Sequence, residues 1–205
     1  MNLKERISVI IRSKNEERWI GHCIQSVIEF LDKPEIIIVD NNSSDETIDI
    51  IKKHDFPNIK FLIESDNGIY DAINKGIELS DNEIISILHS DDFYNNENVL
   101  QDITNAFLEN DSNDIVFGDL IYVKKRDINY NLRYWRPGAY QSKSFLKGWH
   151  PPHPGFFCKT EFYREFGGFD EKLLISADFD IMMKIIMKYM FNILSNRLIF
   201  GSFDQ

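Results

Sequence analysis

The chain has 205 residues, of which 43% are hydrophobic and 27% charged, as in an ordinary globular protein. Its formal net charge of −10 argues against nucleic acid as the main partner, because binding phosphates needs a basic face. No apolar run approaches the ~20 residues of a membrane span, and the N-terminus carries no signal-peptide pattern. We therefore expect a soluble, cytoplasmic protein.

Strands and helices alternate along the first half of the chain. Apolar runs predict strands over residues 7–11, 35–39, 59–63 and 84–88. Apolar residues at helical spacing predict helices over about 19–31, 46–52 and 69–77. Asn15 is the expected cap of the first helix, and Ser43 with Glu46 has the spacing of a capping box. The order predicts a Rossmann-like half with right-handed crossovers.

The second half has a different character. Its predicted elements are a helix near 99–108, strands at 115–118 and 120–124, and helices near 161–166 and 177–190. An aromatic, proline-bearing stretch runs from Tyr134 to Phe157. No low-complexity linker separates the halves, so we expect a single domain over residues 1–205.

Two smaller features have ordinary explanations. Lys124-Lys125-Arg126, with Arg133 and Arg136 nearby, is a local basic patch, and a solvated hairpin is the favoured interpretation. Cys23 falls on the apolar face of the first predicted helix, where a small core residue is expected rather than a ligand or nucleophile.

Carboxylates follow two of the predicted strands. Asp40 comes directly after the strand at 35–39, and Asp91-Asp92 follows the strand at 84–88. Ligands of such sheets bind outside the carboxyl ends of the strands. The turn after the first strand has no glycine, so neither of the usual phosphate-binding loops is present. A bound diphosphate would then need a cation, and Asp91-Asp92 offers oxygen ligands suited to Mg²⁺ or Mn²⁺, although capping or plain exposure also explains an isolated acidic pair.

An ordered set of motifs makes the chain similar to the family-2 glycosyltransferases over nearly its whole length. The motifs are residues 7–16, 40–47, 66–76, 90–92, 117–119, 153–154, 167–171 and 177–180. The resemblance implies a GT-A fold of the α/β class, with a Rossmann-like mixed sheet flanked by helices. Residues 1–92 would form the nucleotide-sugar half, and residues 93–205 the acceptor half fused to it.

The resemblance also implies a reaction. A sugar would pass with inversion from a nucleoside-diphosphate sugar, with UDP as the expected nucleotide, to a hydroxyl of a sugar, a lipid-linked sugar or another acceptor. Cell-surface polysaccharide or glycolipid synthesis is the expected setting. A peripheral contact with the inner face of the membrane is left open.

Individual residues receive roles from the same resemblance. Donor binding is implied for Ser13, Asn15, Glu16, Asp40, Gly68, Ala72, Asn74 and Asp91. Asp40 would bond the nucleotide base, Asp92 would be the direct metal ligand, and Asp91 would face the ribose or a metal-bound water. Asp178 would be the general base. His153 and Trp149 would contact the acceptor.

Helix geometry independently separates two candidate bases. Asp178 shares a helix face with Ile181 and Met182, whereas Asp180 aligns with Lys184 as a solvated i,i+4 pair. An acid on the inward side of a helix start usually has a partner or a functional reason. The sequence therefore favours Asp178.

The chain departs from the family pattern at three positions. Arg12 stands where proline is usual, His89 replaces a leading acid, and Ala177 replaces the acid before the base. Two other functions stay open. A nucleotidyltransferase would need a basic glycine-rich loop, which is lacking, and a non-catalytic nucleotide-sugar sensor would be expected to lack the acid at position 92 or 178.

Overall fold

The structure, a computed structural model, describes residues 7–29, 34–54, 56–109, 113–189 and 193–203. Its strands are β1 (Ile7–Ser13), β2 (Glu35–Asp40), β3 (Ile59–Ile63), β4 (Ile84–His89), β5 (Asp92–Tyr94), β6 (Ile115–Lys124), β7 (Asp127–Trp135), β8 (Phe156–Lys159) and β9 (Ile193–Phe203). Its α-helices are α1 (Ile20–Ile28), α2 (Thr47–Lys53), α3 (Ile69–Leu79), α4 (Val99–Glu109), α5 (Thr160–Phe166) and α6 (Ala177–Lys188). Two short 3₁₀ helices cover Ser144–Lys147 and His153–Gly155.

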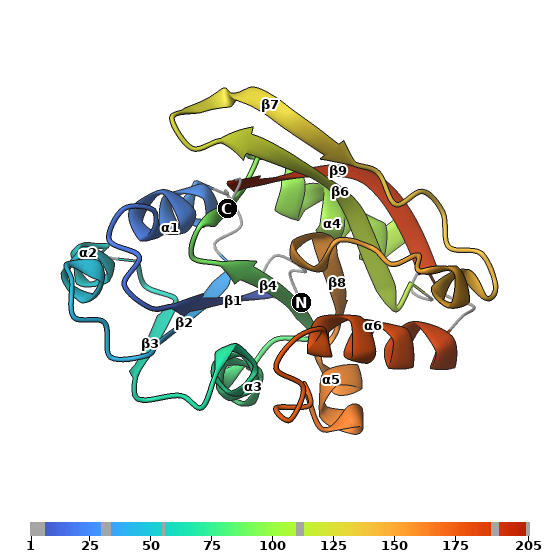
Figure 1. The fold of residues 1–205 in the computed structure, drawn as a ribbon, viewed down its shortest axis with the longest axis horizontal. Coiled ribbons are helices and arrows are strands. Elements are labelled where there is room, and N and C mark those ends of the chain that lie inside the picture. Colours follow the sequence, from blue (N-terminus) through green and yellow to red (C-terminus); the bar gives the residue numbers. More distant parts are fainter. Residues whose placement is uncertain (1–6, 30–33, 55, 110–112, 190–192, 204–205) are drawn as a thin grey trace.

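The nine described strands form one mixed sheet between two layers of helices (Figure 1). The strand order is β3-β2-β1-β4-β8-β6-β9-β5, and β7 pairs with β6. The four strands of the first half are parallel to one another, as predicted. In the second half β8 runs antiparallel between β4 and β6, while β9 is parallel to β6. The expected α/β class with a mixed sheet is confirmed.

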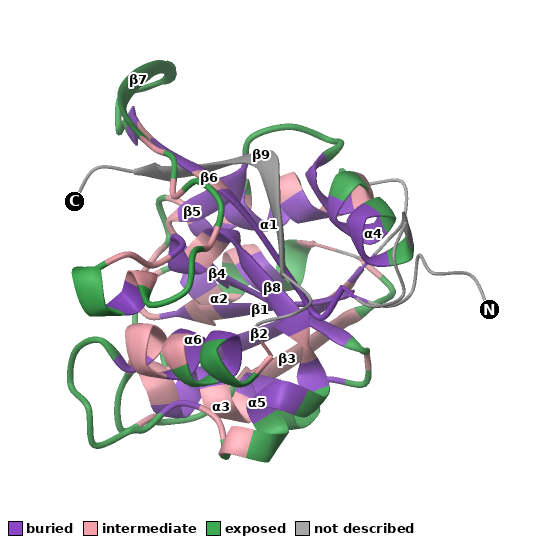
Figure 2. Cartoon of the chain, turned by 90° about the vertical axis from the view of Figure 1, so that its right-hand side faces the viewer, coloured by how far each residue is buried: buried purple, intermediate pink, exposed green. Residues whose placement is uncertain are grey.

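The central strands β1, β2 and β4 are buried on both faces, which explains their continuous apolar runs. Val9 and Ile11 of β1 face one core together with residues of α1 and α4, whereas Ile10 between them faces the other core with α3, α5 and α6. The central strands are buried and the outer helix faces exposed in Figure 2. Among the described residues, no helix has both the length and the apolar character needed to cross a membrane.

Most predicted elements form, but two predicted caps do not. Neither α1 nor α2 has a side-chain hydrogen bond at its N-cap. Instead, the backbone N–H of Asn15 donates to the Ser43 hydroxyl and so joins the loops that precede the two helices. The expected strands at 115–118 and 120–124 are one strand, β6. Cys23 is buried in the core, as expected. The helix ends predicted at Leu31 and Met190 lie outside the described residues.

Candidate active site

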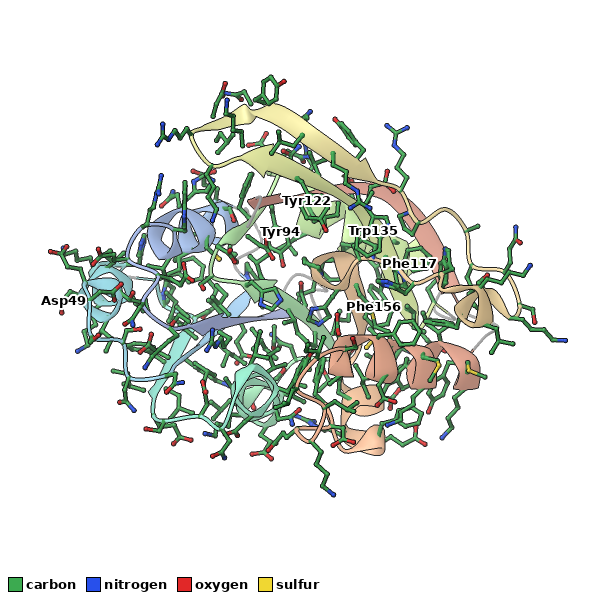
Figure 3. All side chains as sticks on the ribbon, viewed as in Figure 1. Asp49, Tyr94, Phe117, Tyr122, Trp135 and Phe156 are labelled. Carbon is green, nitrogen blue, oxygen red and sulfur yellow. The ribbon has the colours of Figure 1, made fainter. Side chains whose placement is uncertain are left out.

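A cleft of about 610 Å³ opens at the carboxyl ends of β1 and β4. The ribbon formed by β6 and β7 lies on its far side, where Tyr122 and Trp135 point inward from the ribbon (Figure 3). The lining residues are Arg12, Glu16, Ile69, His89, Ser90, Asp91, Asp92, Leu120, Tyr122, Trp135, His150, His153, Pro154 and Asp178. Both halves of the chain contribute, so a ligand in the cleft would contact both.

Besides Glu16, three carboxylates reach the cleft from two directions. Asp91 and Asp92 lie where β4 turns into β5, and Asp92 is only 3% exposed. Asp178 lies in the first turn of α6, on the opposite half of the chain. The site therefore brings an acidic pair, of which Asp92 is buried, opposite a separate carboxylate.

Tyr70 positions the start of α6. Its hydroxyl accepts a hydrogen bond from the Ala177 N–H at 3.2 Å and donates one to Asp178 Oδ1 at 3.4 Å. Burial, together with the negative charge of Asp178, raises the pKa of Tyr70. Asp180 instead pairs with Lys184 Nζ at 2.6 Å, one turn further along the helix. Asp178 thus lines the cleft and contacts Tyr70, whereas Asp180 pairs with Lys184, as helix geometry predicts.

Arg12 lines the same cleft as Glu16 and Asp91. Its Nε is 4.0 Å from Asp66 Oδ2, and both of these buried atoms lack a hydrogen-bond partner within the described residues. Asn41 Nδ2 fixes the other oxygen of Asp66 at 2.7 Å. Burial raises the pKa of Glu16, and the charge of Asp91 raises it further, whereas Arg12 lowers it. The guanidinium therefore offsets acidic charge on this side of the cleft, and Lys125 adds to its effect on Glu16.

Asp40 is fully buried and does not line the cleft. Its Oδ1 accepts the Ser43 N–H, and its Oδ2 accepts the hydroxyls of Ser13 and Ser43, each at 2.7 Å. The hydrogen bond to a nucleotide base that is expected of Asp40 would have to share or replace one of these three bonds. In this arrangement the residue ties together the loops that follow β1 and β2.

Asn15 belongs to the same loop network. Its N–H donates to Ser43 Oγ at 2.8 Å, and its Oδ1 accepts the Ser44 N–H at 2.9 Å. The residue has a left-handed backbone conformation with φ of 52° and is exposed. Ser13 and Asn15 therefore shape the loops that follow β1 and β2. Glu16, in the loop after β1, lines the cleft together with Arg12.

The residues expected at the start of α3 lie away from the cleft. Gly68 caps the helix with φ of 142°, and Ala72 is buried in the core. Asn74 Nδ2 donates to the Phe169 carbonyl at 2.9 Å, and its Oδ1 accepts the Phe169 N–H at 2.8 Å. A Cβ on Gly168 would meet Asn74 Oδ1 at 2.4 Å, so the loop needs glycine there. Asn74 thus joins α3 to the loop before α6.

His153 is buried in the cleft wall, and its Nε2 has no hydrogen-bond partner among the described residues. Burial, with a smaller contribution from His89, lowers the pKa of His153 to about 4, against the opposing charge of Asp178. The His153 ring lies 5.7 Å from the His89 ring. It therefore stays neutral near pH 7 and offers a polar atom to the cleft.

Trp149 lies outside the cleft, in an aromatic cluster with Phe117 and Phe145. Its indole N–H donates to the Pro137 carbonyl at 2.7 Å. The acceptor contact expected for Trp149 has no support from this placement. Trp135 is the tryptophan that lines the cleft.

Of the residues singled out from the sequence, the cleft collects Glu16, Asp91, Asp92, His153 and Asp178. The sequence marks Arg12 and His89 only as departures from the family pattern, and it gives no sign of the role of Tyr70. Arg12 could have been found, because a charged residue at the carboxyl end of a buried strand needs a partner or a ligand. Nothing in the local sequence connects Tyr70 with Asp178.

Known proteins are similar to this chain in sequence. The model of glycosyl transferase family 2 matches residues 8–165. A PGL/p-HBAD biosynthesis glycosyltransferase of Mycobacterium bovis strain BCG is 25% identical over 97% of this chain and 78% of its own length.

Solved structures share the fold. TarS 1-349 of S. aureus, in complex with UDP-GlcNAc, aligns with a TM-score of 0.75 at 20% identity, over 98% of this chain and 59% of its own. The mannosyltransferase PcManGT of Pyrobaculum calidifontis, in complex with GDP-Man and Mn²⁺, aligns with a TM-score of 0.68 at 20% identity, over 96% of this chain and 56% of its own. The chain thus spans somewhat over half the length of these solved chains, and the expected GT-A fold is confirmed.

Proposed function

Because the chain belongs to glycosyl transferase family 2, we propose that it transfers a sugar, with inversion, from a nucleoside-diphosphate sugar to an acceptor hydroxyl. The observation that carries the proposal is the cleft in which Asp91 and Asp92 lie on one side and Asp178 on the other. Cell-surface glycan synthesis is the proposed setting, in line with the name of the mycobacterial relative. The cytoplasmic location expected from the sequence stays a prediction.

Asp178 is the proposed general base. Its carboxylate takes the proton of the acceptor hydroxyl while that oxygen attacks the anomeric carbon and the bond to the nucleoside diphosphate breaks. A single displacement of this kind inverts the configuration. General-base help of this type contributes roughly 10²–10⁴-fold. Tyr70 keeps the base oriented through its hydroxyl.

Asp92 and Asp91 are the proposed holders of a divalent cation. The described residues contain no group of three His, Cys, Asp or Glu side chains that could hold a metal alone. Mg²⁺, however, is usually bound by one or two carboxylates together with substrate phosphates. The two carboxylates therefore fit an ion that the donor helps to bind, as the Mn²⁺ bound with GDP-Man in PcManGT also suggests. Such an ion stabilises negative charge on the leaving diphosphate.

The rest of the cleft divides between donor and acceptor. Arg12 and Glu16 would contact the donor, with UDP the expected nucleotide because TarS binds UDP-GlcNAc. His153 and Trp135 would face the acceptor from the second half of the chain. A tryptophan face stacks well on the apolar side of a sugar ring.

Two probes test the proposal, UDP-GlcNAc and GDP-mannose, each with Mn²⁺. Titration calorimetry measures donor binding, and chromatography measures release of nucleoside diphosphate by transfer or slow hydrolysis. Asp178→Asn should bind the donor normally but lower turnover by about 10² or more, because an amide cannot accept the proton. Asp180→Asn is the matched control and should be nearly silent, since an exposed pair contributes at most ~1 kcal/mol.

The outcomes separate the rival functions. Donor binding without any product, in the wild type and both variants, would indicate a non-catalytic sensor. Formation of a nucleotide sugar and pyrophosphate from a nucleoside triphosphate and a sugar phosphate would indicate a nucleotidyltransferase. If Asp180→Asn were the inactive variant, the base would be misassigned.

A further inference from the structure

The ribbon of β6 and β7 projects from the body of the protein (Figures 1 and 2). Every residue from Asp127 to Tyr134 is exposed, and within the described chain β7 pairs only with β6. β7 is thus an edge strand of the sheet, because the other side of β6 is paired with β9. This element therefore leaves an unusual amount of strand uncovered.

The exposed ribbon is apolar as well as extended. Four of its side chains are large and hydrophobic, with exposed fractions of 40% to 56%: Ile128, Tyr130, Leu132 and Tyr134. Proteins normally protect a free edge strand with charges and keep apolar patches small. Charge protection would explain the basic residues at the ends of the ribbon but not the apolar residues between them.

The ribbon is also strongly basic within an acidic protein. Residues 124–136 hold five Lys or Arg and a single Asp, while the whole chain has a formal charge of −10. Lys124 lies over the Tyr130 ring at 5.5 Å, and Arg136 over the Tyr134 ring at 5.2 Å. Cations and aromatic rings are therefore interleaved on one projection, whose charge is complementary to an anionic surface.

We propose that this ribbon is a membrane-docking element that binds the surface of a bilayer containing anionic lipids. Such a surface accommodates both kinds of side chain at once. Apolar and tyrosine side chains enter the boundary between headgroups and acyl chains, while Lys and Arg neutralise the lipid phosphates. An acidic protein or a nucleic acid would satisfy the charges but would leave the apolar side chains without a matching environment.

Docking by the ribbon would place the bilayer beside the cleft. Tyr122 and Trp135 line the cleft from the same two strands (Figure 3). If the proposed transfer function holds, an acceptor attached to a lipid would meet the acceptor side of the cleft at the membrane surface. Lipid binding itself does not depend on that function and can be measured without it.

Vesicle co-sedimentation tests the proposal on the 205-residue chain. Vesicles of phosphatidylglycerol and phosphatidylcholine should bind the protein, vesicles of phosphatidylcholine alone should not, and binding should weaken with added salt. Lys125→Glu/Arg126→Glu should lower partition by about 30-fold or more, because each cation near an anionic surface contributes roughly fivefold. Tyr130→Ser/Leu132→Ser should also lower it.

Matched controls lie elsewhere on the surface. Lys52→Glu/Lys53→Glu on α2 repeats the charge change, and Leu79→Ser/Met187→Ser removes apolar side chains of comparable exposure. Both controls should bind vesicles like the wild type. Melting temperature and nucleotide-donor affinity identify any variant that has lost its fold. If a variant does not fold, the salt dependence of vesicle binding by the wild type still tests whether the basic residues contribute to binding.

The proposal is overturned if the wild type ignores anionic vesicles, or if the folded ribbon variants bind them as well as the controls do. A wild-type dimer that becomes monomeric in the ribbon variants, with no vesicle binding, would instead make the ribbon an interface between two copies. Equal binding to neutral and anionic vesicles would also contradict it.

Discussion

The Tyr70 hydroxyl joins the start of α3 to the start of α6, because it accepts the Ala177 N–H and donates to Asp178 Oδ1. The two helices lie 107 residues apart in the chain at this contact. The tyrosine ring also stacks on Phe169, with ring centroids 5.6 Å apart. The proposed base is therefore held by a residue of the donor half rather than only by its own helix.

Tyr70→Phe tests this positioning role. The substitution keeps the ring packing and removes both hydrogen bonds of the hydroxyl, of which the one to the charged Asp178 is an interaction of about 1.5–3 kcal/mol. We expect kcat to fall about tenfold or more while donor affinity changes little. Tyr134→Phe on the ribbon is the control for loss of a tyrosine hydroxyl. Equal kcat values for Tyr70→Phe and the wild type would show that Asp178 needs no such support.

Arg12→Ala tests the cation of the donor side. Removal of a guanidinium from the neighbourhood of a bound diphosphate or base should weaken donor binding about tenfold, as measured by calorimetry. Arg18→Ala removes an exposed arginine of the same loop and should have little effect. An unchanged affinity in Arg12→Ala, together with a lowered melting temperature, would limit Arg12 to its contact with Asp66.

Chelation tests the metal. We expect EDTA to weaken the binding of UDP or UDP-GlcNAc and Mn²⁺ to restore it, because Asp91 and Asp92 line the cleft and the turn after β1 is not a glycine-rich phosphate-binding loop. Asp92→Asn should abolish the difference between the two conditions. A donor affinity that is the same with EDTA and with Mn²⁺ would show that Arg12 and other side chains suffice for the diphosphate.

His153 makes stability depend on pH. Burial lowers the pKa of His153 to about 4, whereas an unfolded histidine titrates near 6.5. Between these values the unfolded chain binds a proton that the folded chain does not, so the free energy of unfolding should fall as pH drops from about 6.5 towards 4. Above pH 6.5 this contribution is fully present.

Urea titrations from pH 4.5 to 7.5 measure that dependence. His153→Gln should flatten the curve in this window, whereas His22→Gln, on an exposed part of α1, should leave it unchanged. The groups facing His153 are His89 of β4 and Asp178 of α6, and the same series in Asp178→Asn measures the opposing effect of the carboxylate. An NMR titration that placed His153 near pH 6.5 would contradict the prediction.

The first half of the fold was predictable because its information is local. Its parallel strands are apolar runs, of which β1, β2 and β4 are buried on both faces, and each crossover helix carries its own apolar stripe. The missed strands depend on distant partners: β8 is only four residues long and is inserted antiparallel between β4 and β6. Its sequence alone does not distinguish it from the aromatic loop before it.

The capping errors have a similar cause. Ser43 has the right spacing to cap α2, but its hydroxyl donates to Asp40, and the Asn15 N–H from another loop donates to it. Asn15 and Ser43 could each cap the helix that follows them, but in the structure they form hydrogen bonds that join two loops. In the cleft, likewise, the acidic residues were visible as motifs, whereas Tyr70 became relevant only when the fold brought α3 beside α6.

Asn74 has a consequence for how the protein would respond to heat. Its two bonds to Phe169, and the glycine they require at position 168, fasten the loop before α6 to a helix of the other half. The spacing between donor-side acids and base is thus set when the chain folds, not when substrate arrives. The cleft should therefore lose its alignment in the same cooperative transition that melts the sheet, without a separate, earlier inactivation.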